Sequence, residues 1–496
     1  MSRVPEPATS WYGSQMVSVF TTSPPKAGSL FLVALATALY GCGSGSSAQP
    51  AADASTPDAS APETSAPDAE TDAGTDAPVA FPAFTVDYPQ IVKNQGTVLG
   101  KPVIVTVTWP GDSNVSTWEA FGDGLGASDY WSATTQQYGV GAATSGPSNH
   151  VHMTQALPTS LSYTDLQTFV AAAIQAAGSD AGAPEAGVAD AGADASAPNP
   201  SWPVPVKDAN GNAQTIYSLF IPPAISVTDP GSGMPFCMEG ALGYHDDVVV
   251  NGIPVAYSVS LECPSMAPSG IEETAAHECV EASTNPYPES KTLGYVGFDP
   301  EHLAWDLYTG FNDELADACE NWADAYYQDT GSFPFWVQRS WSNAAALTGH
   351  DPCVPAPAGA YHGMTLFPSQ ETTLKVDLSS IGGGTSSTHG FGVSIGKPLT
   401  FQVGFFSDAT TAPWTIAYDF PAQTQLFTET GAFVGNGKGT VSIDKTTGQN
   451  GDKATVTVTV TAKGDAGFHV MAITWDPPSA QSGYLPHYLP LVLVDQ

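Results

Sequence analysis

Two low-complexity tracts decide which parts of this 496-residue chain can fold. Residues 43–81 consist mostly of Ala, Pro, Asp, Ser and Thr, and residues 178–200 have a similar composition. Segments with so few large apolar side chains cannot bury enough surface to offset the conformational entropy lost on folding. We therefore expect the first tract to be a disordered acidic linker and the second to be a surface-loop insertion. The first folded domain is then expected over residues 82–355.

Residues 1–42 resemble the signal peptide of a bacterial lipoprotein. Lys26 precedes an apolar run at residues 29–39, and the chain continues through Tyr and Gly to Cys42. A basic residue, a short apolar core and a small residue before the cut are typical of a secretory signal, and the run is too short to span a bilayer. The Leu-x-Gly-Cys ending resembles a lipobox, which implies that Cys42 carries the lipid; an ordinary cleaved signal is the alternative. We expect a secreted protein, lipid-anchored to the outer membrane or cell surface.

The charge balance excludes one class of partner. The formal net charge is −36, from 13 basic and 49 acidic residues. A chain with such an excess of negative charge is repelled by phosphate backbones. We therefore expect no nucleic-acid partner.

Residues 82–355 alternate between predicted strands and helices. An Asn251-Gly252 pair supplies the positive φ angles of a tight hairpin turn, and Thr164 is a candidate helix cap. The pattern predicts strands at 103–109 and 216–221, a helix at 164–177 and a hairpin over 248–259. Strands with intervening helices predict an α+β or α/β layered domain.

From residue 359 to 496 the pattern changes to short strands separated by Gly, Pro, Asn and Asp. Alternation with period two is clearest at residues 455–460, where Thr and Val take turns. The pattern predicts strands at 374–378, 399–406, 440–443, 455–460, 468–475 and 491–494. Such a series is typical of an all-β sandwich of immunoglobulin-like type.

One segment carries a candidate chemistry. Ser269 and Glu272 have capping-box spacing, so we expect a helix that starts there and stops before Asn285-Pro286. His277 and Glu281 are four residues apart, which places both on one helix face, one turn from each other. Glu278 is adjacent, where it can reach a water molecule next to the metal.

This arrangement follows the His-Glu-x-x-His logic of metallopeptidases, with Glu281 in place of the second His. A carboxylate is a competent zinc ligand. By analogy, Zn²⁺ activates water, and Glu278 acts as the general base and later protonates the leaving amine. We therefore expect a metal-dependent hydrolase, most simply a zinc peptidase acting on a peptide or protein. A non-catalytic surface protein for adhesion or signalling, with a structural metal, is the alternative.

The chain also resembles the plant Exordium (phosphate-induced protein) family and its metallopeptidase-like bacterial relatives with a His-Glu-x-x-Glu helix. The matching pieces are Tyr130-Trp131, Gln137 to Gly141, Gly243-Tyr244-His245, His277 to Pro286, Ala304-Trp305, Glu314 to Cys319, and Val337-Gln338 with Trp341-Ser342-Asn343. The order and spacing of these pieces extend over most of residues 100–355. The resemblance implies a metallopeptidase-like domain around the helix.

The third metal ligand has three candidates. Asp317 and Glu314 are three residues apart and would share a face of a later helix that we expect to start near Asn312; we favour Asp317. His245 is either a ligand, a donor to the developing oxyanion, or a structural histidine beside a disulfide. A site of histidines and carboxylates also suits iron or manganese. His150 and His152 would share one strand face, but the sequence shows no partner for them.

The cysteines indicate export. Without Cys42, five of the six cysteines remain. We place Cys279 on the buried face of the metal helix as an unpaired thiol. In an oxidising compartment the other four can form two disulfides, for which we favour Cys237–Cys263 and Cys319–Cys353.

Overall fold

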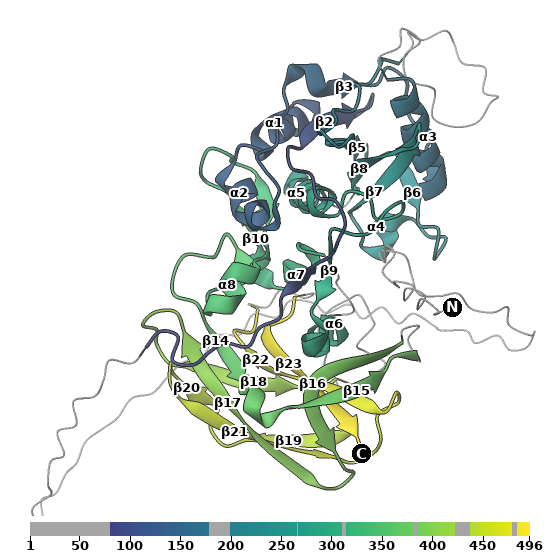
Figure 1. Ribbon diagram of the computed structural model, residues 1–496. Helices are drawn as coiled ribbons and strands as arrows, with labels where there is room; N and C mark the ends of the chain where they lie inside the picture. Colours follow the sequence, from purple (N-terminus) through teal and green to yellow (C-terminus); the bar gives the residue numbers. More distant parts are fainter. Residues whose placement is uncertain are drawn as a thin grey trace, which may run out of the picture. The chain divides into compact units, whose positions relative to one another are not determined.

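A computed structural model describes residues 80–177, 199–264, 266–309, 314–379, 384–421, 437–478 and 484–496 (Figure 1). The expected signal peptide with Cys42, nearly all of the linker, most of the insertion and the helix start near Asn312 lie outside the described residues. Within the described ranges, no helix combines the length and the apolar character needed to cross a membrane.

A five-stranded sheet organises the N-terminal half of the described chain. Its order is β3 (His150–His152), β2 (Val103–Thr108), β5 (Thr215–Ile221), β8 (Ile253–Leu261) and β7 (Gly243–Val250). The first four run parallel, and β7 pairs antiparallel with β8. Asn251 and Gly252 take φ angles of 53° and 77° between β7 and β8, which confirms the predicted hairpin turn.

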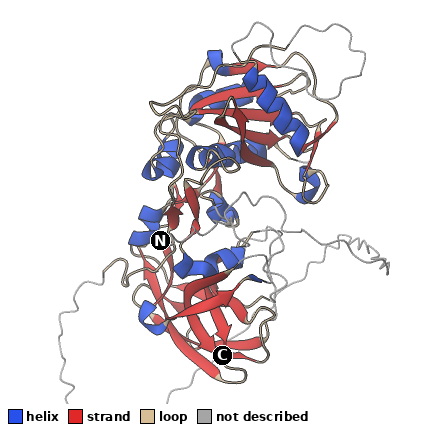
Figure 2. Ribbon diagram, turned by 45° about the vertical axis from the view of Figure 1, so that its right-hand side comes forward, coloured by secondary structure: helices blue, strands red, loops and turns tan. Residues whose placement is uncertain are grey.

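Helices cover both faces of this sheet, as Figures 1 and 2 show. On one face, α3 (Tyr163–Gln175) buries Leu166, Phe169 and Val170 with side chains of β2, β5 and β8. On the other face, α1 (Val115–Leu125) and α5 (Pro268–Thr284) pack on Ile104 and Phe220. The α3 cap is Ser162, whose hydroxyl accepts from the Asp165 N–H. The expectation that Thr164 caps this helix was therefore wrong.

The metal helix α5 exists, but its start differs from the prediction. The helix begins at Pro268 with Ala267 as a cap that makes no side-chain hydrogen bond. Proline is favoured in the first helical turn because it lacks the N–H that would go unpaired there. Glu272 accepts a hydrogen bond from the Trp336 N–H instead, so the predicted capping box was wrong. Asn285 ends the helix as expected.

Shorter helices and two-stranded pairs complete the described structure. The helices are α2 (Asp129–Thr135), α4 (Phe236–Glu239), α6 (Leu303–Thr309), α7 (Asp317–Glu320) and α8 (Asn343–Thr348). Two-stranded pairs form between β1 (Ile91–Lys93) and β9 (Tyr295–Phe298), β4 (Ser160–Ser162) and β6 (Ser226–Thr228), β10 (Tyr326–Gln328) and β11 (Trp336–Gln338), and β12 (Ser340–Trp341) and β13 (Cys353–Val354).

The C-terminal region is β-rich, as predicted. One sheet has the order β14 (His362–Leu366), β17 (Pro398–Ser407), β21 (Lys453–Val460) and β19 (Gly439–Ile443). The other has the order β15 (Thr372–Asp377), β16 (Thr385–Val393), β23 (His487–Asp495), β22 (Phe468–Trp475), β18 (Trp414–Asp419) and β20 (Thr447–Gly448). All the expected strands are present, and β14, β16, β18 and β20 were not predicted.

One apolar core runs through both C-terminal sheets and into the elements before them. Phe405 of β17 and Val456 of β21 belong to it together with Val470 of β22 and Leu491 of β23. Trp305 of α6 is part of the same core. Alternate residues of β21 are buried, which is the period-two signal that the sequence showed.

The cysteines pair as predicted. Cys237 is bonded to Cys263, and Cys319 to Cys353. Cys279 is free and buried, where it packs with the apolar side of α5. Disulfides of this kind are consistent with an extracellular protein.

Candidate metal centre

The centre of the site is one face of α5. His277 and Glu281 are both buried, and His277 Nε2 lies 3.0 Å from Glu281 Oε2. The other oxygen, Glu281 Oε1, accepts hydrogen bonds from the backbone N–H groups of Ala316 and Asp317 at 3.1 and 3.2 Å. One carboxylate oxygen is therefore fixed by the backbone, which leaves the second oxygen directed at the histidine.

Asp317 reaches the same histidine from a different segment. Its Oδ1 lies 3.3 Å from His277 Nε2. Asp317 is the first residue of α7, which is a single turn in the described part of the chain, so the longer helix expected there is not what presents it. Glu320, the last residue of that turn, lies in a group with His277 and Asp317 whose ligand atoms are all within 4.8 Å of one another. Sequence reasoning missed Glu320, although its spacing of three residues from Asp317 was a usable signal.

His245 enters the site from β7. Its Nδ1 lies 3.5 Å from Glu278 Oε2 and 3.7 Å from Glu281 Oε2. Its Nε2 lies 3.6 Å from Glu314 Oε1, and Glu314 in turn accepts a hydrogen bond of 2.6 Å from Asn285 Nδ2. The structure thus brings all six residues expected at the site together, namely His245, His277, Glu278, Glu281, Glu314 and Asp317.

Gln338 of β11 orients His277, and the sequence analysis assigned it no role. Its Nε2 donates to the Ala316 carbonyl at 2.7 Å, and its Oε1 lies 3.0 Å from His277 Nδ1. An amide oxygen accepts only, so Nδ1 of His277 donates its proton to Gln338, and Nε2 is the nitrogen that faces the carboxylates. Metal-binding histidines are commonly oriented by such a partner on the second nitrogen.

These residues fit a metal ion. The Nε2 atoms of both His277 and His245 are buried and face carboxylate oxygens, at 3.0 and 3.3 Å for His277 and 3.6 Å for His245. Two ligands of one tetrahedral zinc ion, each about 2.0–2.1 Å from it, lie about 3.3 Å apart. The distances from His277 Nε2 to Glu281 and Asp317, 3.0 and 3.3 Å, match that separation. Nitrogen and carboxylate ligands suit zinc, iron and manganese.

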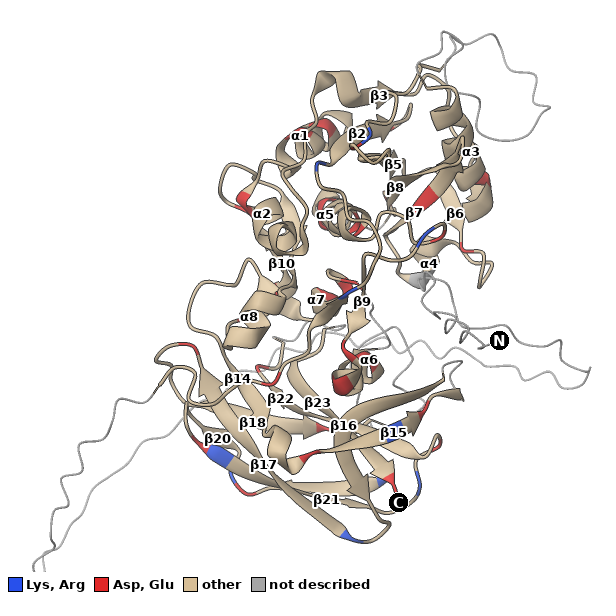
Figure 3. Cartoon of the chain, in the orientation of Figure 1, with Lys and Arg blue, Asp and Glu red and all other residues tan. Residues whose placement is uncertain are grey.

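The electrostatics of the site also favour a bound cation. Figure 3 shows acidic segments on α5 and α7. Burial lowers the pKa of His277, but the carboxylates of Glu281 and Asp317 outweigh burial and hold the pKa well above its ordinary value. Burial and the neighbouring Asp317 raise the pKa of Glu281 well above its ordinary value. Buried carboxylates that repel one another are stabilised when they coordinate a cation.

The pKa of His245 responds to neighbouring carboxylates in the same way. Burial lowers its pKa, but Glu314 and Glu278 outweigh burial and raise the pKa to about 10. Burial raises the pKa of Glu314. A divalent ion would replace the imidazolium protons as the positive charge that these carboxylates require.

Comparison with known proteins adds little. No family model matches the chain, and no curated protein matches it. A solved structure of domains 1–6 of the surface layer protein SbsC aligns at 13% identity with 32% of this chain. The alignment spans 23% of that structure's chain, and the TM-score is 0.14. A likeness this low carries no argument about fold or function.

Proposed function

We propose that this chain is a secreted metal-dependent hydrolase that uses Zn²⁺ and acts on a peptide or protein. One observation carries the proposal. His277 Nε2 is buried and faces the carboxylates of Glu281 and Asp317 at 3.0 and 3.3 Å. The resemblance to the Exordium family and its metallopeptidase-like relatives supports the same reading.

The residues of the site divide into metal ligands and a general base. When bound, Zn²⁺ supplies a Lewis acid that activates water and polarises the scissile carbonyl. His277, Glu281 and Asp317 would hold it, with Glu314 as a further ligand candidate. Glu278 follows His277 in α5 but contacts His245 at 3.5 Å.

We assign Glu278 the role of general base. It would take a proton from the attacking water and deliver it to the leaving amine. His245 positions the Glu278 carboxylate, and its other nitrogen is available as a donor to the oxyanion that forms during attack.

A structural metal in a non-catalytic adhesion or signalling protein is the second candidate. The burial of the site favours it, because the side chains of His277, Glu278 and Glu281 are only 6%, 4% and 2% exposed. Such closure is typical of structural zinc sites, whereas catalytic sites keep one position open. The two candidates differ in Glu278, which only a catalyst requires.

The position of the protein is part of the proposal. We infer that lipidation of Cys42 anchors it to the outer membrane or cell surface, with the tract after Cys42 as a tether. The two C-terminal sheets would form an immunoglobulin-like module that binds or spaces the enzyme at the surface.

Elemental analysis with a peptide-library assay tests the function. The purified protein is compared with His277→Ala, Glu278→Gln and a matched control, Glu273→Gln, which changes a neighbouring carboxylate of α5 that lies outside the groups that can hold an ion. We expect one equivalent of zinc at this site, lost in His277→Ala and retained in Glu278→Gln. Loss of the general base should lower hydrolysis by about 10²–10⁴-fold.

The outcomes separate the candidates. Retained zinc with peptide cleavage unaffected by Glu278→Gln, or with no cleavage by any variant, would favour the structural metal. An absence of zinc at this site even after reconstitution would overturn both metal proposals. Equal loss of activity in Glu273→Gln would show that the effect is not specific to Glu278.

A further inference from the structure

The candidate metal centre contains donor atoms for more than one ion. His245, Glu278 and Glu281 form a group of their own, in which one ligand atom of each lies within 4.8 Å of the other two. His245 Nδ1 lies 3.5 Å from Glu278 Oε2 and 3.7 Å from Glu281 Oε2. Two ligands of a tetrahedral ion with bonds of about 2.0–2.2 Å lie about 3.3–3.6 Å apart. The separations in this group are close to that range, so a second ion fits among these three side chains.

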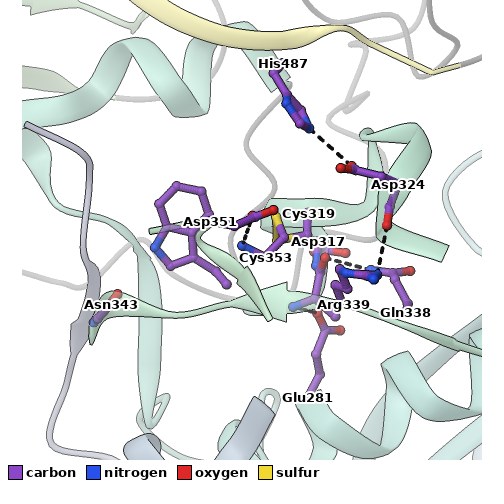
Figure 4. Close-up of a disulfide and its surroundings, with 12 residues drawn as sticks. Glu281, Asp317, Cys319, Asp324, Gln338, Arg339, Asn343, Asp351, Cys353 and His487 are labelled. Carbon is purple, nitrogen blue, oxygen red and sulfur yellow. Dashed lines mark hydrogen bonds and ion pairs between the residues drawn. A yellow bond between two sulfur atoms is a disulfide. The ribbon is translucent and has the colours of Figure 1, made fainter. Parts of the chain in front are cut away.

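Glu281 belongs to the surroundings of both histidines. Its Oε2 lies 3.0 Å from His277 Nε2 and 3.7 Å from His245 Nδ1. Its Oε1 accepts hydrogen bonds from the backbone N–H groups of Ala316 and Asp317, and Figure 4 shows the Glu281 side chain directed toward Asp317. Two-metal sites hold their ions about 3.5–4 Å apart. An oxygen that faces both histidines is placed to be shared by two such ions.

The second nitrogen of His245 faces a carboxylate that would orient the ring. His245 Nε2 lies 3.6 Å from Glu314 Oε1, and Asn285 Nδ2 donates to the same oxygen at 2.6 Å. The His245 side chain is only 5% exposed. A histidine that binds a metal through one nitrogen commonly has a carboxylate on the other. Nδ1 is therefore the nitrogen that would bind the second ion.

The charge of the centre also leaves room for a second ion. The groups that can hold an ion contain five carboxylates, namely Glu278, Glu281, Glu314, Asp317 and Glu320, and a first divalent ion offsets two of these charges. Without an ion, His245 is an imidazolium that forms ion pairs with its carboxylate neighbours. A second ion would displace the Nδ1 proton and supply more positive charge at the same position.

We propose that His245, Glu278 and Glu281 bind a second divalent transition-metal ion, which inactivates the enzyme while it is bound. The inference rests on the proposed function, in which Glu278 is the general base. A carboxylate that coordinates an ion is no longer available to take a proton from water. The second ion binds more weakly than the first, because the two ions share Glu281 and repel each other. The protein is then active with one ion and inactive with two.

Zinc titration of the full-length protein by equilibrium dialysis tests the binding. We expect one equivalent at low free zinc and a second, weaker equivalent at higher free zinc. His245→Gln and Glu278→Gln should each keep the first equivalent and weaken the second by at least about 100-fold, since loss of a group that only orients a metal ligand already costs about 10–100-fold. Retention of the first equivalent shows that each variant is folded. The control Glu273→Gln removes a carboxylate of α5 outside these groups and should keep both equivalents.

Peptide cleavage measured over the same titration tests the inactivation. Cleavage by the unmodified protein should rise as the first equivalent binds. It should fall by about 10²–10⁴-fold as the second equivalent occupies the general base, and lower free zinc should restore it. Glu273→Gln should follow the same course.

The outcomes separate this inference from the proposed function. Saturation at one equivalent, or a second equivalent that His245→Gln and Glu278→Gln both bind unchanged, overturns the second site. Cleavage that stays at its maximum while the second equivalent binds overturns the inactivation. Two equivalents that depend on these residues, without cleavage at any zinc concentration, would support the second site and overturn the proposed hydrolase together with its inactivation. An absence of bound zinc overturns both proposals.

Discussion

Oε1 of Gln338 lies 3.0 Å from Nδ1 of His277, although 61 residues separate them in the sequence. The contact fixes which nitrogen of the histidine carries a proton and leaves Nε2 to face Glu281 and Asp317. A residue that is not itself a candidate ligand thereby orients the histidine toward the carboxylates.

Gln338→Met should weaken zinc binding by about 10–100-fold, because the histidine loses the acceptor that fixes its tautomer. Competition with a chromophoric chelator measures the affinity. The matched control is Gln214→Met, which changes another buried glutamine whose hydrogen bonds go to Lys101 and Ala213. Equal affinities of the two variants would show that Gln338 does not orient the site.

The Cys319–Cys353 disulfide should support both stability and metal binding, since Cys319 follows Asp317 by two residues in α7. Removal of both cysteines, as Cys319→Ala with Cys353→Ala, should lower the free energy of unfolding by about 3–4 kcal/mol. Zinc affinity should also fall, because the turn that presents Asp317 loses its link to β13.

Removal of the Cys237–Cys263 disulfide is the control for this effect. Its residues are 26 apart, against 34 for the other pair, so the loss of stability should be similar. Chemical denaturation and zinc titration of both double variants give the comparison. A loss of zinc affinity that is the same in both would indicate a general effect of destabilisation.

Gly243 should not tolerate a side chain. A Cβ atom there would lie 2.6 Å from the Val259 carbonyl oxygen and 3.1 Å from Glu278 Oε1. We expect Gly243→Ala to lower stability by about 1–3 kcal/mol and to displace the Glu278 carboxylate. The control is Gly100→Ala, where the nearest atom is 4.0 Å away. Thermal denaturation that ranks the two variants equally would contradict the prediction.

His302 should make the free energy of unfolding fall as the pH rises through the alkaline range. Burial lowers its pKa, but hydrogen bonds to Asp299 and Asp87 outweigh burial and raise the pKa to about 10. The folded state therefore holds the proton more tightly than the unfolded chain, whose histidine has a pKa of about 6.5. The stabilisation is complete below pH 6.5 and is lost as the pH rises toward 10.

The comparison of His302→Gln with the unmodified protein isolates this effect. Glu371 also faces His302, and burial and Asp87 raise the pKa of Glu371 to about 7. Denaturation midpoints between pH 7.5 and 10 avoid that second titration. The difference in stability between the two proteins should shrink over this interval, because His302 loses its proton there. A constant difference would mean that the protonation state of His302 does not change between pH 7.5 and 10.

Local pattern alone determined much of this protein. The spacing of His277 and Glu281 placed both on one face of α5, because a helix repeats every 3.6 residues. The alternation at residues 455–460 gave a half-buried strand, and Asn251-Gly252 gave a hairpin turn, because both depend on neighbours in the chain. The four cysteines left after Cys279 allowed three pairings, and the favoured one is the pairing observed.

The helix starts show where local pattern is insufficient. Glu272 had the spacing to cap α5, yet it accepts from Trp336, which no local rule includes. Ser162, not Thr164, caps α3. Only the first case needed tertiary structure, because the cap of α3 is a local capping box between Ser162 and Asp165, which are three residues apart.

Tertiary structure alone decided the convergence of the candidate metal site. Gln338 reaches His277 because β11 packs beside α5. His150 and His152 likewise face Glu119 at 3.3 and 2.9 Å, from the neighbouring α1. Such contacts join segments whose sequence separation carries no periodic signal, since they form only when whole sheets and helices pack and bury their apolar faces.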